Sequence, residues 1–63
     1  MMLKVMDLCK LLPKMRVQIC HASTSEVLFE GVLEDCPYRV CDMDIEKVEA
    51  QFVNGVDYLI LAE

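Results

Sequence analysis

Glycine, basic side chains and long apolar runs are all scarce in this sequence. The two glycines among 63 residues cannot form a glycine-rich phosphate-binding loop. No apolar stretch is long enough to predict a transmembrane helix. Six Lys and Arg against eleven Asp and Glu give a formal net charge of −5, which argues against direct binding to nucleic acid or an anionic membrane. The chain also begins without the basic start and small-residue cleavage site of a signal peptide, so we expect a cytosolic protein.

Catalytic and metal motifs are missing as well. A zinc site usually contains closely spaced ligand pairs such as Cys-x-x-Cys, and Cys9, Cys20, Cys36 and Cys41 include none. We expect reduced, metal-free thiols, with a metal site and a disulfide as the alternatives. His21 reads as a polar turn residue, and no Ser, His and Asp set has the spacing of a catalytic triad. The sequence therefore predicts no enzyme activity, no cofactor and no metal.

Apolar residues, in contrast, are abundant for so short a chain. They make up 56% of the 63 residues, which form one domain (1–63) near the lower size limit for a self-sustaining core. Some of this apolar surface is expected to be buried against another copy or a partner.

The first half of the chain predicts a helix followed by a β-hairpin. Apolar residues cover most of 3–12, and Pro13 ends the helix because the residue before a proline avoids helical backbone angles. Residues 15–20 alternate with a period of two, and 26–34 form a second strand after a turn at 21–25. The expected inward residues are Met15, Val17, Ile19, Val27, Phe29 and Leu33.

The second half predicts a short helical turn and a second hairpin. Pro37 suits the start of the turn, with Asp35 as its N-cap. Asn54-Gly55 is a strong type I′ turn signal between two apolar-rich runs. With Val53 opposite Val56, one face of the hairpin is the expected core face, and it holds Val48, Ala50, Phe52, Leu59 and Leu61. The other face holds Glu49, Gln51, Val53, Val56, Tyr58 and Ile60.

We therefore predict an α+β fold, with an N-terminal helix packed on a four-stranded antiparallel sheet of two hairpins. A curled version of this sheet would be an SH3-like barrel.

Two surfaces are candidate binding sites. Ten of the acids lie after residue 25, against only Arg39 and Lys47. The acids Glu26, Glu30 and Glu34 share one face of the predicted second strand, and Asp42 and Asp44 follow in an alternating acidic segment. These residues are expected to bind a basic protein. The second candidate surface carries Tyr58 and Ile60, and we expect a homodimer built on it or on the edge of the Tyr58 strand.

A family resemblance rests on short sequence segments that mark the ends and cores of the predicted elements along most of the chain. Leu-Leu-Pro at 11–13, Val-x-Ile at 17–19, Glu-Val-Leu-Phe-Glu-Gly at 26–31, Pro-Tyr at 37–38 and Tyr-Leu-Ile-Leu at 58–61 are the elements that carry it. The pattern resembles small proteins of phages and prophages of Gram-positive gut bacteria. It implies a short accessory protein that acts by binding, such as an inhibitor or modulator of a host protein.

Three functional hypotheses follow. The first is a non-catalytic protein whose acidic surface engages a basic partner, such as a nucleic-acid-binding protein. The second is a homo-oligomeric scaffold, or a protein that sequesters a small molecule at a subunit interface. The third is an enzyme fragment or subunit.

Overall fold

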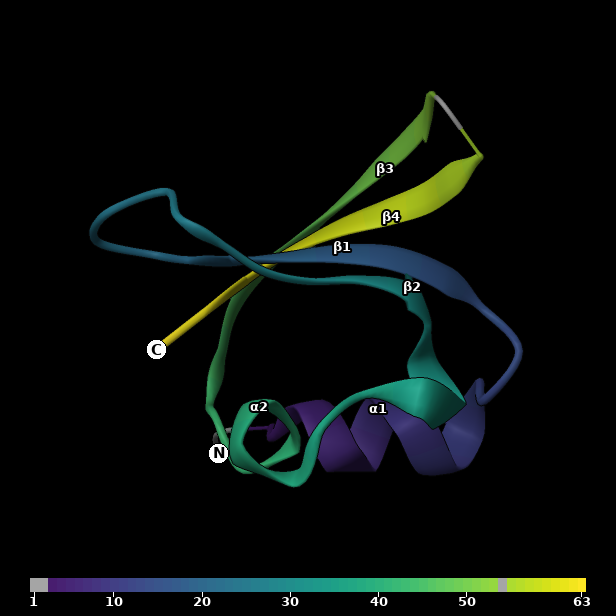
Figure 1. The fold of residues 1–63 in the computed structure, drawn as a ribbon, viewed down its shortest axis with the longest axis horizontal. Helices are drawn as coiled ribbons and strands as arrows, with labels where there is room; N and C mark the ends of the chain where they lie inside the picture. The colour runs from purple at the N-terminus through teal and green to yellow at the C-terminus, as the bar shows by residue number, and fades with distance from the viewer. Residues whose placement is uncertain (1–2, 54) are drawn as a thin grey trace.

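The predicted order of helix, hairpin, helical turn and hairpin is confirmed. The computed structural model describes residues 3–53 and 55–63 (Figure 1). Its elements are α1 (Val5–Leu11), β1 (Arg16–His21), β2 (Val27–Val32), the 3-10 turn η1 (Leu33–Asp35), α2 (Tyr38–Cys41), β3 (Ile45–Val53) and β4 (Val56–Ala62).

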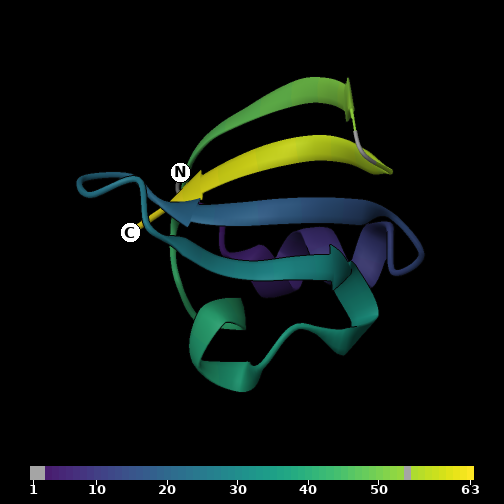
Figure 2. The ribbon, with the colours of Figure 1, turned by 45° about the horizontal axis from the view of Figure 1, so that its top comes forward.

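The four strands form one mixed sheet in the order β2-β1-β4-β3 (Figure 2). Both hairpins are antiparallel as expected, but the central pair, β1 with β4, is parallel, so the prediction of an all-antiparallel sheet is wrong there. The cause is the connection after β2. It carries η1 and α2 beneath the sheet, back to the end where β2 began (Figure 1). Because β3 therefore starts at the same end of the sheet as β2, the second hairpin enters the sheet with β4 parallel to β1.

Both helices lie on the same face of the sheet, and the core fills the space between (Figure 1). The largest fully buried side chains are Val5 of α1, Val17 and Ile19 of β1, Leu33 of η1 and Ile60 of β4. The inward prediction for Val17 and Ile19 is confirmed. We call the face of the sheet opposite the helices the open face.

The helix α1 is shorter than the predicted 3–12, because the residues before it join the sheet. The Ile45 N–H donates to the Leu3 carbonyl at 2.7 Å, and the Val5 N–H donates to the Met43 carbonyl at 3.0 Å. The helix starts after Lys4, whose N–H donates to the Asp7 carboxylate at 3.0 Å. Asp7 thus supplies the helix start that the sequence pattern did not reveal.

The second hairpin contains a bulge that changes which residues face the core. The pair Val53 and Val56 is in register as predicted. Phe52, with φ of +53°, adds one residue to β3, so that Ala50 pairs with Tyr58 and Val48 with Ile60. The predicted core residues Leu59 and Leu61 therefore lie on the open face, while Val56 and Ile60 are buried. Phe52 itself is 72% exposed, so its assignment to the core was wrong.

A bulge also alters the first hairpin. Ile19 pairs with Phe29, but the next residue, Cys20, pairs with Val27, so Leu28 is the extra residue. Val27 is consequently exposed rather than inward, and Phe29 packs on the core as predicted.

The other predicted features of the connections have mixed outcomes. The helical turn after Pro37 is confirmed, but its N-cap is Pro37 and not Asp35, which belongs to η1. Gly31 has φ of +153°, and a Cβ there would lie 3.2 Å from the ring of Phe29. The Phe29 ring therefore packs against the backbone of Gly31, in the space that a side chain at residue 31 would occupy. Gly55 has φ of +78°, but the Asn54 half of the predicted turn lies outside the described residues.

Candidate functional site

The three glutamates predicted to line one strand face are separated in the structure. β2 spans only Val27–Val32, so Glu26 precedes it and Glu34 lies in η1. Glu30 is on the open face and accepts a hydrogen bond from the Gln18 amide at 3.0 Å. Glu34 is paired with Lys14 at 2.8 Å. The prediction of a row of three acids is therefore wrong, because both ends of the predicted strand belong to connections.

Asp42 and Asp44, in contrast, are brought together as a pair. The Lys4 ammonium lies 3.6 Å from a carboxylate oxygen of each, and it also donates to the Asp42 carbonyl at 2.9 Å. Lys4, at the start of α1, thus forms ion pairs with two acids of the segment that leads into β3.

Two further acids join this pair at the same end of the sheet. The backbone of Asp44 exchanges two hydrogen bonds with that of Glu63, each of 2.9 Å, which places the chain terminus beside the start of β3. A hydrogen bond to the Glu63 carboxylate raises the pKa of Glu46, and repulsion from Glu63 and Asp44 acts in the same direction. We call Asp42, Asp44, Glu46 and Glu63 the acidic end.

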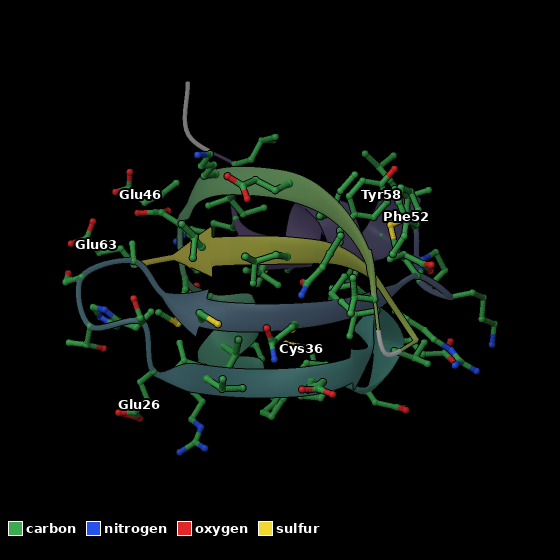
Figure 3. The ribbon with its side chains drawn as sticks, turned by 90° about the horizontal axis from the view of Figure 1, so that it is seen from above. Glu26, Cys36, Glu46, Phe52, Tyr58 and Glu63 are labelled. Carbon is green, nitrogen blue, oxygen red and sulfur yellow. The ribbon has the colours of Figure 1, made fainter. Side chains whose placement is uncertain are left out.

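Figure 3 shows three acidic side chains at one end of the sheet and an aromatic pair at the other. Glu46 and Glu63 point outward at one end, and Glu26 lies at that end as well. Phe52 and Tyr58 lie together at the opposite end, with ring centroids 6.1 Å apart. Sequence reasoning missed Glu46 and Glu63 as site residues. The alternation Asp42-x-Asp44-x-Glu46 was a signal that could have identified Glu46. Glu63 had no such signal, because only its pairing with Asp44 brings it to this end of the sheet.

The second predicted surface is largely inside the fold. Ile60 is fully buried between the sheet and the helices, so it cannot contribute to an exposed face. Tyr58 is half-buried and packs against the core. Their strand, β4, is central in the sheet, so the prediction that it forms an edge is also wrong. The edges are β2 and β3.

Three of the four cysteines lie on the helical side of the sheet. The thiol of Cys9 donates to the Leu33 carbonyl and that of Cys41 to the Cys36 carbonyl, both at 3.4 Å. Burial, together with a hydrogen bond to Cys41, raises the pKa of Cys36 to about 12. Cys20 is buried in β1 on the open face. All four are free thiols here, and their redox state in the cell stays a prediction.

Within residues 3–53 and 55–63, no group of three or more His, Cys, Asp or Glu side chains is arranged to hold a metal ion. No helix in the same part of the chain is long and apolar enough to cross a membrane. Two open hollows of about 290 Å³ are present, one beside Arg16 and Glu30 and the other beside His21, Glu26 and Arg39.

Comparison with family models, with curated proteins and with solved structures found no match.

Proposed function

We propose that this protein is a non-catalytic binding protein whose acidic end engages a basic protein partner. The observation that carries the proposal is the Glu46–Glu63 pair. A hydrogen bond to the Glu63 carboxylate, together with repulsion from the Glu63 charge, raises the pKa of Glu46. In the described part of the chain, neither carboxylate takes part in an ion pair, whereas Lys4 already serves Asp42 and Asp44.

A cation from outside the molecule would relieve this repulsion. An arginine or lysine of a partner placed between Glu46 and Glu63 would convert a like-charge contact into charge-assisted hydrogen bonds. Because these carboxylates are at the surface, the attraction would be screened by salt and would mainly set the association rate and the orientation of the partner.

The proposal keeps part of the predicted acidic site and moves its centre. Asp42 and Asp44 stay in it, and Glu26 lies at the same end of the sheet (Figure 3). Glu34 leaves it, because Lys14 already neutralises it, and Glu30 leaves it, because it lies within the open face.

The biological setting is proposed on the resemblance described for the sequence. That resemblance supports an accessory protein of phage or prophage type that inhibits or modulates a basic, nucleic-acid-binding host protein in the cytosol. The SH3-like curl of the sheet is also a proposal. The twist of β3 and β4 away from β1 and β2 supports curvature (Figure 1), while the parallel β1–β4 pair differs from an all-antiparallel barrel.

The test uses a fluorescein-labelled arginine-rich peptide as a defined basic probe, followed by fluorescence anisotropy at low and high salt. We expect the double variant Glu46→Gln with Glu63→Gln to lose most of the binding. The matched control, Glu30→Gln with Glu34→Gln, changes the net charge equally and should keep it. Equal losses in both variants would mean unspecific charge attraction, and unchanged binding in both would exclude the acidic end.

A further inference from the structure

The outer edge of β3 is open along most of its length. β3 is the last strand of the sheet, and only its beginning is covered, where the Ile45 N–H donates to the Leu3 carbonyl. Beyond that point, no strand among residues 3–53 and 55–63 pairs with the outer side of 46–51 (Figure 2). Such an edge presents unpaired N–H and C=O groups in line, ready to pair with another strand.

The side chains on this edge form a self-complementary pattern. Lys47 and Glu49 lie on the open face, with side chains 60% and 47% exposed, and form an ion pair of 2.6 Å. Val48 lies between them on the opposite face and is 44% exposed. Val48 is therefore flanked by a positive charge on one side, Lys47, and a negative charge on the other, Glu49.

We propose that β3 pairs antiparallel with β3 of a second copy of this chain, with Val48 at the two-fold axis. In this register Lys47 lies opposite the partner's Glu49, and Glu49 lies opposite the partner's Lys47. The two Val48 side chains lie opposite each other, and the two sheets join into one with both helical layers on the same side. Opposite charges in directly facing positions stabilise a strand pair, and like charges destabilise it.

The charge pattern selects this register over its neighbours. Moving the two-fold axis to Glu49 would place two glutamates opposite each other, and moving it to Lys47 would do the same with two lysines. Glu46 lies in the irregularity between Ile45 and Lys47, so regular pairing ends there. With the axis at Val48, the two Glu46 residues stay about 14 Å apart along the strands. The acidic ends therefore point away from each other and remain free.

The other edge of the sheet does not offer such complementarity. Glu30 is the one charged residue of Val27–Val32 in β2, so no register of β2 with itself pairs opposite charges. The bulge at Phe52 ends regular pairing at one end of β3, and the register shift between Ile45 and Lys47, together with the Leu3 contact, ends it at the other. The predicted interface is thus short and bounded, which favours a closed dimer over an extended assembly.

The test measures mass in solution by sedimentation velocity at high micromolar concentration. We expect wild-type protein to be a dimer, and we expect Lys47→Glu and Glu49→Lys each to be monomeric, because each variant places like charges opposite one another. The double exchange Lys47→Glu with Glu49→Lys keeps every opposite pair and should restore the dimer. Mixing the two single variants should also form a dimer, because each supplies the charge that the other lacks.

Far-UV circular dichroism checks that each variant is folded. If one single variant is not, the other single variant and the double exchange still decide the matter. A monomeric wild-type protein would overturn the proposal, as would single variants that both stay dimeric or a mixture that stays monomeric. An assembly larger than a dimer would also overturn it. None of these results bears on the acidic end, whose test uses other residues.

Discussion

Replacing Ile60 by alanine tests the arrangement of the whole second hairpin. Ile60 is fully buried in β4, opposite Ile19 on one side and Val48 on the other. The substitution removes three carbon atoms, which at about 0.8 kcal/mol each gives a transfer term of about 2.4 kcal/mol. The unfilled cavity adds to this, so a total loss of about 3–4 kcal/mol is expected, within the usual range for such substitutions.

A loss of that size is a large part of the stability of a small domain. At about 0.05–0.15 kcal/mol per residue, the free energy of unfolding of this chain is about 3–9 kcal/mol. Ile60→Val, expected to cost about 0.5–1.5 kcal/mol, therefore supplies a milder variant whose loss stays within the stability of the domain. Urea unfolding followed by far-UV circular dichroism at one protein concentration measures each loss.

Leu61 provides the matched control for this measurement. It follows Ile60 directly but lies on the open face opposite Lys47, where part of its side chain stays in water. Leu61→Ala should therefore cost no more than about half as much as Ile60→Ala, because less apolar surface is removed from the core. If Leu61→Ala proves the more destabilising of the two, the bulge at Phe52 and the register described above are refuted.

Three further predictions concern the turn, the thiols and the acidic end. Gly55→Val should lower the free energy of unfolding by about 1–3 kcal/mol, because φ of +78° strains a β-branched residue; an unchanged melting temperature would contradict this. Iodoacetamide should alkylate Cys36 much more slowly in folded than in urea-unfolded protein, since burial and Cys41 raise its pKa to about 12 and leave little thiolate; equal rates by mass spectrometry would be evidence against it. Glu46→Gln should raise the melting temperature at neutral pH and much less below about pH 4. Because Glu63 raises the pKa of Glu46 in the folded state, the native protein holds this proton more readily than the unfolded chain, and stability falls as pH rises through the folded pKa; a gain that is independent of pH would argue against the repulsion.

The sequence by itself determined the local elements of this protein. Pro13 and Pro37 mark a helix end and a helix start because a proline restricts the backbone on both of its sides. The alternation of Val17 and Ile19 with polar residues placed β1 correctly, since neighbouring side chains of a strand must point to opposite faces. Of the acidic end, the sequence alone identified Asp42 and Asp44 as candidate binding residues, because they lie close together in the chain.

The tertiary structure alone decided how these elements combine. One inserted residue, Phe52, reverses which side of β4 meets the helices, and no pattern of period two reveals an insertion of one. The parallel contact of β1 with β4 depends on the path of the chain beneath the sheet between β2 and β3. The acidic end requires Glu63 to pair with Asp44, and the free edge of β3 requires the strand order. Each of these joins residues that are distant in the sequence, where local preferences carry no information about pairing.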